Sequence, residues 1–340
     1  SLQPRARRIM TKRIILAHLP TPIHHFDALD RLVGVEVWLK RDDFTAGAAA
    51  GNKVRKLEFL LAEATQRAAT HVITCGGEQS NHARATALFA AQLGMRSVLL
   101  LRTNQPSRPP RPTGNILLSR LSGAKTLWIT PEDYAQRDRL MAEEAGRLSL
   151  EGAWPYVIPE GGSNGLGALG YVQAMLETRQ QLDLGLLGAI REFDSIVTAC
   201  GSGGTAAGAG LGAHHYGVAG RVQAIAVCDD IQYFRNVIDG IVLDARAIDP
   251  KLSAAVPIDV VDEYRGPAYA VASEEQLAFI ADVARATGVI LDPVYTGKAL
   301  YALSRMRDKP QRCLFLHTGG LPGALAQPEA LAAFATYERP

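Results

Sequence analysis

The sequence predicts an α/β fold of two domains, with mainly parallel sheets that carry helices on both faces. Two observations support this prediction. Short runs rich in β-branched and aliphatic residues alternate with amphipathic helical patterns along the whole chain, as expected of parallel strands joined by helical crossovers. The length of 340 residues also exceeds what a single compact core usually holds, so we expect two domains.

The expected strands are short apolar runs bounded by turn residues. They lie at residues 35–40, 71–74, 97–101, 126–129, 156–158, 195–200, 222–227 and 312–317. The clearest helical pattern spans residues 53–69, where Val54, Leu57 and Leu61 share one face. Ligands bind such sheets where strands end and helices begin, so polar residues at these junctions are the candidate functional residues.

The composition narrows the classes of function. Lys and Arg number 36 and Asp and Glu 34, so the net charge of +2 gives no reason to expect nucleic acid or a membrane as a partner. No apolar run reaches the ~18 residues of a membrane span. Cys75, Cys200, Cys228 and Cys313 show no CxxC spacing, which favours reduced thiols and a cytoplasmic location. The basic start of the chain lacks the apolar core of a secretory signal and fits a transit-peptide remnant or a cloning remnant equally.

The first junction is Gly51-Asn-Lys-Val-Arg-Lys56, which places three cations at the start of a helix. Gly51 permits an unusual backbone angle, and Asn52 is a suitable helix cap. Cations are disfavoured at this end of a helix, because the helix dipole is already positive there. The pattern is explained if Lys53 must lose its proton, since nearby positive charge lowers the pKa of an amine and frees it to form an imine. Solvated surface lysines are the alternative.

The second junction is Cys75-Gly-Gly-Glu-Gln-Ser-Asn-His82, between an expected strand and a helix that runs to Leu93. Its glycines allow backbone amides to turn toward a ligand, and Ser80 and Asn81 lie at the helix start. This arrangement suits a carboxylate or a phosphate. An ordinary turn capped by Ser80 is the alternative, and His82 is either a chemical group or a packed histidine.

The third junction follows the expected strand at residues 195–200 and is Gly201-Ser-Gly-Gly-Thr205, leading into a helix of small residues. Closely spaced glycines and two hydroxyl groups at a helix N-terminus favour phosphate binding. The phosphate of pyridoxal 5′-phosphate (PLP) is one candidate for this loop.

A dinucleotide is the other candidate for the same loop. Gly201, Gly203 and Ala206 satisfy a relaxed G-x-G-x-x-G/A pattern, and the next strand is followed by Asp229 and Asp230. An acid at that distance is typical of a site that binds the ribose of a dinucleotide. From this stretch alone, a dinucleotide-binding oxidoreductase and a PLP protein both remain open.

Two further turns near the C-terminus carry hydroxyl groups. They contain Tyr295 and Thr296, and Thr318 directly after an apolar strand. Tyr295 is a candidate acid or base if its phenol faces a dry pocket, and Thr318 is a candidate partner of a heterocycle nitrogen. A helix cap at Thr296 and a plain glycine turn after Thr318 are the alternatives.

Motifs in order along nearly the whole chain carry a family resemblance. They are HLPTP, VEVWLKRDD, GNKVRKLEFL, QSNHAR, GGSNGLGALGY, GSGGTAAG, LDPVYTGKA and LHTGG. Together they resemble the fold-type II PLP enzymes related to tryptophan synthase β. More narrowly, they resemble the branch that contains D-cysteine desulfhydrase, 1-aminocyclopropane-1-carboxylate (ACC) deaminase and L-cysteate sulfo-lyase. Such a series is far more specific than one glycine loop, and it favours PLP over the dinucleotide.

The resemblance implies a role for each candidate residue. Lys53 is the implied Schiff-base lysine, Asn81 the partner of the PLP ring hydroxyl and Thr318 the residue facing the pyridine nitrogen. Ser80 lies in the region for the substrate carboxylate, and Tyr295 matches the active-site tyrosine. The implied set is catalytic Lys53, Ser80 and Tyr295; cofactor-binding Lys53, Asn81, Gly201, Ser202, Gly203, Gly204, Thr205 and Thr318; and substrate-binding Ser80, Asn81, His82, Tyr295 and Thr296, with no metal.

Two positions favour one activity within the branch. ACC deaminase relatives usually carry an acid after the tyrosine and a leucine before the final glycine pair, where this chain has Thr296 and Thr318. We therefore expect D-cysteine desulfhydrase activity, with ACC deaminase or L-cysteate sulfo-lyase activity as alternatives. Two departures from the pattern bear on substrate choice. Ala50 replaces a usual glycine, and Glu78 is expected to place an acid beside the carboxylate pocket, where it would either repel cysteate or select a cationic substrate.

The resemblance also implies the domain boundaries and the assembly. A large PLP-binding domain is expected from residues 1–53 and 166–340, and a small domain from residues 54–165, with PLP in the cleft between them. The protein is expected to be a homodimer that acts on a small amino acid. The non-enzymatic alternative, a catalytically silent PLP-binding protein, is disfavoured because Lys53, Ser80 and Tyr295 are all present.

Overall fold

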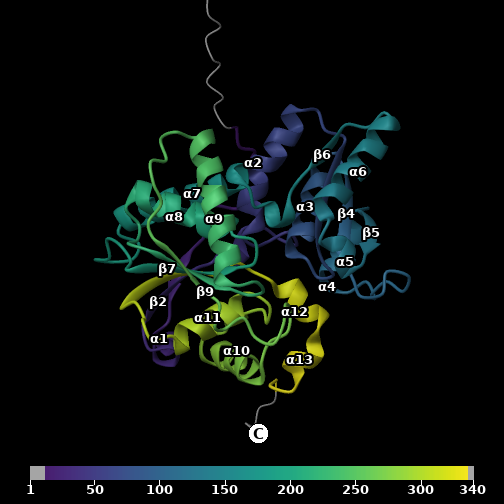
Figure 1. The fold of residues 1–340 in the computed structure, drawn as a ribbon. Helices are drawn as coiled ribbons and strands as arrows, with labels where there is room; N and C mark the ends of the chain where they lie inside the picture. The colour runs from purple at the N-terminus through teal and green to yellow at the C-terminus, as the bar shows by residue number, and fades with distance from the viewer. Residues whose placement is uncertain (1–11, 336–340) are drawn as a thin grey trace, which may run out of the picture.

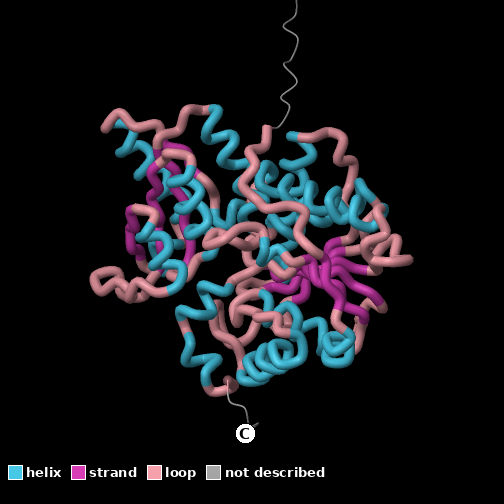
Figure 2. The backbone as a smooth tube through the Cα atoms, turned by 180° about the vertical axis from the view of Figure 1, so that it is seen from behind, coloured by secondary structure: helices cyan, strands magenta, loops and turns pink. Residues whose placement is uncertain are grey.

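A computed structural model describes residues 12–335, so the basic start of the chain lies almost wholly outside the described part. Within it, two separate sheets are covered by helices on both faces (Figure 1), and the predicted α/β fold is confirmed. Seen from behind in Figure 2, the strands form two distinct groups joined by loops and helices. No helix in residues 12–335 is both long and apolar enough to cross a membrane.

The larger sheet has the strand order β1-β2-β10-β7-β8-β9. Its neighbours pair in parallel except for β1 and β2, which are antiparallel. The last strand of the described chain, β10, therefore lies in the middle of this sheet, between β2 and β7. The bounds are β1 Ile23–His25, β2 Glu36–Lys40, β7 Ser195–Cys200, β8 Val222–Ala226, β9 Ile258–Val261 and β10 Arg312–Leu316.

The smaller sheet is fully parallel, with the order β5-β4-β3-β6. Its strands are β3 His71–Gly77, β4 Arg96–Arg102, β5 Lys125–Ile129 and β6 Pro155–Val157. All eight predicted strands overlap strands of the structure, while the short strands β1 and β9 were not predicted. The smaller sheet lies within the predicted small domain, but the boundaries at residues 53 and 166 stay a prediction.

Helices pack on both faces of each sheet. On the larger sheet, α7, α8 and α9 bury one face and α1, α10 and α11 the other (Figure 1). On the smaller sheet, α2 and α3 lie on one side and α6 on the other. The bounds are α1 Asp27–Val33, α2 Lys53–Gln66, α3 Asn81–Gln92, α4 Gly114–Leu121, α5 Pro131–Tyr134, α6 Arg137–Leu150, α7 Gly165–Asp183, α8 Gly204–Tyr216, α9 Ile231–Ile248, α10 Glu274–Thr287, α11 Thr296–Arg305, α12 Leu321–Ala326 and α13 Pro328–Ala332.

Glycines allow α7 to pack directly against α8 and α2. A Cβ atom on Gly208 of α8 would lie 2.1 Å from the carbonyl oxygen of Ala168. A Cβ atom on Gly170 of α7 would lie 2.3 Å from the carbonyl oxygen of Arg55 in α2. Both distances are far inside van der Waals contact, so a larger residue at either position would push the helices apart.

A buried ionic network joins β2, α2 and α7, with Arg55 at its centre. The Nε and Nη2 atoms of Arg55 donate to the two carboxylate oxygens of Asp42, both at 2.8 Å. Its Nη1 atom donates to Glu177 at 3.0 Å, and Lys40 donates to the same carboxylate at 2.5 Å. The hydroxyl of Tyr171 donates to Asp42 at 2.6 Å. The network therefore fixes the first turn of α2, which also carries Lys53.

Pairing with Arg55 dominates the protonation of both acids. Burial alone would raise the pKa of Asp42, but attraction to Arg55 and the hydrogen bonds from it leave the pKa below the ordinary value of 3.8. For Glu177 the same opposition leaves the pKa below 4.5. The unfolded chain therefore binds more protons than the folded one at acidic pH. The stabilisation is complete above these ordinary values and is lost as the pH falls through the lowered folded-state values.

We expect Arg55→Met to lower the free energy of unfolding by about 3–5 kcal/mol, because it leaves two buried carboxylates with too few cations. The variant should also lose less of its stability on acidification than the unmodified protein. Urea unfolding at neutral and acidic pH measures both effects. Arg67→Met is the control, since Arg67 is 65% exposed and pairs with Glu63 at the surface; its effect should stay below about 1 kcal/mol. Equal losses in the two variants would contradict a central role for Arg55.

Candidate active site

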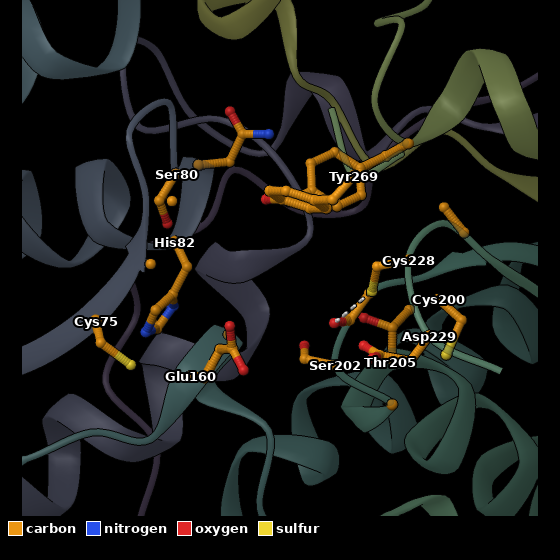
Figure 3. Close-up of a pocket in the computed structure, with 18 of the residues that line it drawn as sticks. Cys75, Ser80, His82, Glu160, Cys200, Ser202, Thr205, Cys228, Asp229 and Tyr269 are labelled. Atoms are coloured by element: carbon orange, nitrogen blue, oxygen red, sulfur yellow. Dashed lines mark hydrogen bonds between the residues drawn. The ribbon is translucent and has the colours of Figure 1, made fainter. Parts of the chain in front are cut away.

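A cavity of about 590 Å³ lies between the two sheets. Its walls come from the segments that follow β3, β7, β8 and β10, together with the end of β4. Figure 3 shows Cys75, Ser80 and His82 on one side of the cavity and Ser202 and Thr205 on the other. The carboxyl ends of strands from both sheets thus meet at one place, which is where ligands bind α/β proteins.

Lys53 is the first residue of α2 and lines the cavity. Among residues 12–335, its amine has no hydrogen-bond or ion-pair partner. Burial lowers the pKa of Lys53 to about 8, although Cys200 and Glu160 oppose this effect. The predicted cause, the positive field of Arg55 and Lys56, is wrong, because burial dominates and Arg55 is neutralised by its paired acids.

The third junction forms the start of α8, as predicted. The helix begins at Gly204 after Gly203, whose φ of 81° is in the left-handed region that favours glycine, and its first turn has neither a side-chain cap nor an acid. Backbone amides at such a helix start suit a phosphate group. The amide of Gly204 instead donates to Ser163 Oγ at 3.2 Å, and Gly204 does not line the cavity. The predicted loop residues that do line the cavity are Gly201, Ser202, Gly203 and Thr205.

Three residues that the sequence analysis did not select support this loop. Lys56 Nζ donates to Ser163 Oγ at 3.1 Å, and the hydroxyls of Ser163 and Ser202 lie 2.8 Å apart. Asn52 Nδ2 donates to Thr205 Oγ1 at 3.0 Å. The start of α2 is therefore bonded to the start of α8. Because Lys56 and Ser163 are 107 positions apart, sequence spacing gave no signal of this contact.

The second junction forms the start of α3. Ser80 is the N-cap, and its hydroxyl accepts a hydrogen bond from the amide of Ala83 at 3.1 Å. Asn81 Oδ1 accepts from Asn115 Nδ2 at 3.0 Å, which orients the amide group of Asn81. A Cβ atom on Gly76 would lie 2.3 Å from Ser80 Oγ, so this turn requires glycine. Ser80 and Asn81 both line the cavity, as predicted.

His82 also lines the cavity and is only 3% exposed. Its Nε2 atom lies 2.9 Å from Thr74 Oγ1, whereas its Nδ1 atom is buried without a partner among the described residues. Burial, with the charges of Lys53 and Lys56, lowers the pKa of His82 well below its usual value. The imidazole is therefore neutral at physiological pH and adds no charge to the cavity.

Tyr295 faces the cavity beside Tyr269, a residue that the sequence analysis missed. Their hydroxyl groups lie 2.8 Å apart, and both side chains line the cavity. Burial raises the pKa of Tyr295 well above its ordinary value, and the neighbouring Tyr269 adds to the effect. Both phenols therefore stay protonated at physiological pH. Lys298 Nζ supports the loop that carries Tyr269, donating to the carbonyl of Ala268 at 3.0 Å.

The two threonines selected from the sequence lie in different environments. Thr318 lines the cavity, and its carbonyl accepts from the amide of Asn52 at 3.1 Å. Thr296 does not line the cavity: it is fully buried, and its hydroxyl donates to Asp292 at 2.7 Å. The structure therefore gives Thr296 a role in building the turn before α11 and no direct position against a substrate.

Glu78 and Ala50, the two residues that depart from the usual family pattern, have little effect on the cavity. The carboxylate of Glu78 accepts from Thr103 Oγ1 at 2.5 Å and does not line the cavity, so the expected repulsion of an anionic substrate has no basis. Ala50 replaces a usual glycine without a positive φ, since the unusual backbone angle belongs to Gly51 at 131°. The carbonyl of Ala50 accepts from Arg84 at 2.7 Å, which holds the lysine loop in place.

The residues around the cavity fit PLP. Its aldehyde requires an amine that is readily deprotonated, and Lys53 provides one without a competing partner. Its phosphate requires donors at a helix start, and Gly201, Ser202, Gly203 and Thr205 line the cavity at the start of α8, whose first turn carries no acid. Its ring requires hydrogen-bonding groups, and Asn81 and Thr318 are available in the same cavity.

Comparisons with known proteins agree with this fit. Residues 14–319 match the family of pyridoxal-phosphate dependent enzymes. The bifunctional D-cysteine desulfhydrase/ACC deaminase of Arabidopsis thaliana, a mitochondrial protein, is 43% identical over 93% of this chain and 80% of its own length. A putative ACC deaminase of Thermotoga maritima is 41% identical, over 94% of this chain and 99% of its own.

Solved structures give the same result. The crystal structure of an ACC deaminase homologue matches with a TM-score of 0.83 at 35% identity, over 96% of this chain and 97% of the homologue. Serine racemase from Dictyostelium discoideum, at 15% identity and a TM-score of 0.60 over 88% of this chain and 92% of its own, shares the fold. The dinucleotide interpretation of the Gly201 loop is thereby excluded, and the cofactor is PLP. The chain belongs to the family of pyridoxal-phosphate dependent enzymes.

Proposed function

We propose that this protein is a PLP-dependent lyase that removes a β-substituent from a small amino acid, with D-cysteine as its preferred substrate. The products are pyruvate, sulfide and ammonia. The proposal depends chiefly on the amine of Lys53, which has no partner among residues 12–335 and shares one cavity with the start of α8 and the Ser80 turn. The name of the Arabidopsis relative, which includes both D-cysteine desulfhydrase and ACC deaminase, supports this reaction class.

The cavity residues divide the binding of cofactor and substrate between the two sheets. Lys53 would hold the aldehyde carbon of PLP, and the amides at the start of α8 its phosphate. Asn81 and Thr318 would bind polar atoms of the ring. The Ser80 hydroxyl and the amides at the start of α3 would bind the substrate carboxylate. When bound, PLP withdraws electrons from the α-carbon of the amino acid.

We assign proton transfer to Lys53 and Tyr295, whose pKa values are shifted by burial. With its pKa near 8, Lys53 Nζ accepts a proton and returns it at neutral pH. Tyr295 stays protonated because burial raises its pKa, so its phenol donates a proton to a departing sulfide. Tyr269 holds that phenol in place through the hydrogen bond between the two hydroxyls. A catalytically silent PLP-binding protein would not require these protonation states of Lys53 and Tyr295.

ACC deaminase activity is the second candidate, supported by the names of the relatives. Only Thr318 now separates the two activities, because the hydroxyl of Thr296 is bonded to Asp292 outside the cavity. L-Cysteate sulfo-lyase activity is the third candidate. A homodimer in the cytoplasm remains our expectation for the assembly and its location. The free cysteines, of which Cys75, Cys200 and Cys313 are buried, support only the reducing compartment.

The purified protein should be yellow from PLP bound at Lys53, and Lys53→Ala should lose the visible absorption band. Lys251→Ala, which changes an exposed lysine far from the cavity, should keep it. Absorption spectra of the three proteins after gel filtration test this directly. Retention of the band in Lys53→Ala would show that another residue holds the cofactor.

The kcat/KM for D-cysteine should exceed that for ACC by about tenfold or more, equivalent to at least ~1.4 kcal/mol in the barrier. Thr318→Leu should lower D-cysteine turnover by about 5- to 15-fold, because it removes one hydrogen-bonding group. Thr65→Leu, an exposed position on α2, is the matched control. Keto-acid release with each substrate measures the comparison. If ACC is the better substrate, the assignment of D-cysteine is wrong.

A further inference from the structure

Arg102 is a cavity residue that the proposed mechanism does not use. It ends β4 and lines the cavity. Its guanidinium carbon lies 4.9 Å from the ring centroid of Tyr134 and 5.2 Å from that of Tyr269. Among residues 12–335, its N–H groups have no hydrogen-bond or ion-pair partner. By contrast, Arg137 in the same cavity pairs with Glu160 at 3.2 Å.

The nearby acids are already engaged elsewhere. Glu160 accepts a hydrogen bond from Tyr134 at 2.5 Å in addition to its ion pair. Glu78 accepts from Thr103 at 2.5 Å and does not line the cavity. Asp229 belongs to the wall formed by the larger sheet (Figure 3). The guanidinium of Arg102 is therefore a positive group on the cavity wall without a protein anion to neutralise it.

Arg102 also lies beside the turn that we assign to the substrate carboxylate. In the register of β3 and β4 it pairs with Gly77, three residues before Ser80. The turn supplies a helix start and a hydroxyl for the α-carboxylate, so the arginine is available for a second acidic group. A guanidinium presents a planar fork of N–H donors that matches the oxygens of a carboxylate or a sulfonate.

We propose that Arg102 binds an anionic group on the β-carbon of the substrate. The inference rests on the proposed lyase function and deepens it: it names Arg102 as the residue that would recognise an acidic β-substituent, such as the sulfonate of cysteate in the third candidate activity. For a β-sulfonate, loss of the α-proton is followed by cleavage of the Cβ–S bond, and the electron pair leaves with sulfur as sulfite. Addition of water to the remaining fragment gives pyruvate and ammonia. A β-carboxylate is no leaving group in this elimination, so aspartate binds without turnover.

The test compares the holoenzyme with Arg102→Gln and Arg102→Lys. The ratio of kcat/KM for cysteate, in its better enantiomer, to that for D-cysteine should fall by about 10- to 100-fold in Arg102→Gln, the loss expected for a charge-assisted contact. The same ratio should fall less in Arg102→Lys, because lysine keeps the positive charge but lacks the planar pair of N–H donors. Calorimetry should show the same order for binding of aspartate. Arg108→Gln, an exposed arginine on the following loop, should match the unmodified protein in both measurements.

Two results would overturn the inference. If cysteate and D-cysteine lose activity equally in Arg102→Gln, the arginine serves the α-carboxylate or the fold. If aspartate and cysteate bind the unmodified holoenzyme no better than alanine, the site has no affinity for a second acid. Failure of the proposed function is distinguishable, because aspartate binding is measured without turnover. A protein that binds aspartate through Arg102 but does not convert D-cysteine would retain this inference and lose the proposed substrate.

Discussion

The hydrogen bonds from Arg55 to Asp42 and Glu177 are the constraint on which the rest of the site depends. They tie the first turn of α2 to the turn that follows β2 and to α7, whereas Lys56, in the same turn, bonds to Gly161 and Ser163 instead. Lys53 lies two residues before Arg55, so its backbone is placed by a contact outside the cavity. Asn52 extends the same fixed turn to the start of α8. The backbone of Lys53 and the start of α8 are thus positioned by hydrogen bonds within the protein, which do not require a bound ligand.

Burial is the main cause of the pKa shifts of the titratable residues around the cavity, and ion pairs contribute little. Burial lowers the pKa of Lys53 and of His82, and it raises the pKa of Tyr295. Each shift favours the neutral form, as expected when a low-dielectric site disfavours charge. The cavity therefore meets a charged cofactor and substrate with a deprotonatable amine, a neutral imidazole and a protonated phenol. The unneutralised charge of Arg102 is an exception in these surroundings, which is why it is a candidate for recognition.

Local sequence patterns predicted much of the fold and the positions of the site residues. Strand–helix alternation predicted the parallel sheets, and the glycine-rich junctions predicted the starts of α3 and α8, because both depend on neighbouring residues. Contacts between distant segments could not be predicted in this way. Arg55 is stable at the start of a helix because it pairs with the distant Glu177. The hydroxyl of Thr296 bonds to Asp292 outside the cavity. Tyr269 and Ser163 were missed because no spacing links them to the partners that they meet only in the folded chain.

The position of β10 has a consequence for how the protein matures in the cell. This strand occupies the middle of the larger sheet, yet it follows the five other strands of that sheet in sequence, and the carbonyl of Thr318 just beyond it accepts a hydrogen bond from Asn52, the residue before Lys53. Until the ribosome has produced the chain as far as Thr318, the sheet lacks β10 and the loop before Lys53 lacks its hydrogen bond to Thr318. Such distant pairings form late and slowly. The four strands of the smaller sheet are contiguous in sequence and precede β10, so we expect the smaller sheet to form first and PLP to bind only after Thr318 has been synthesised.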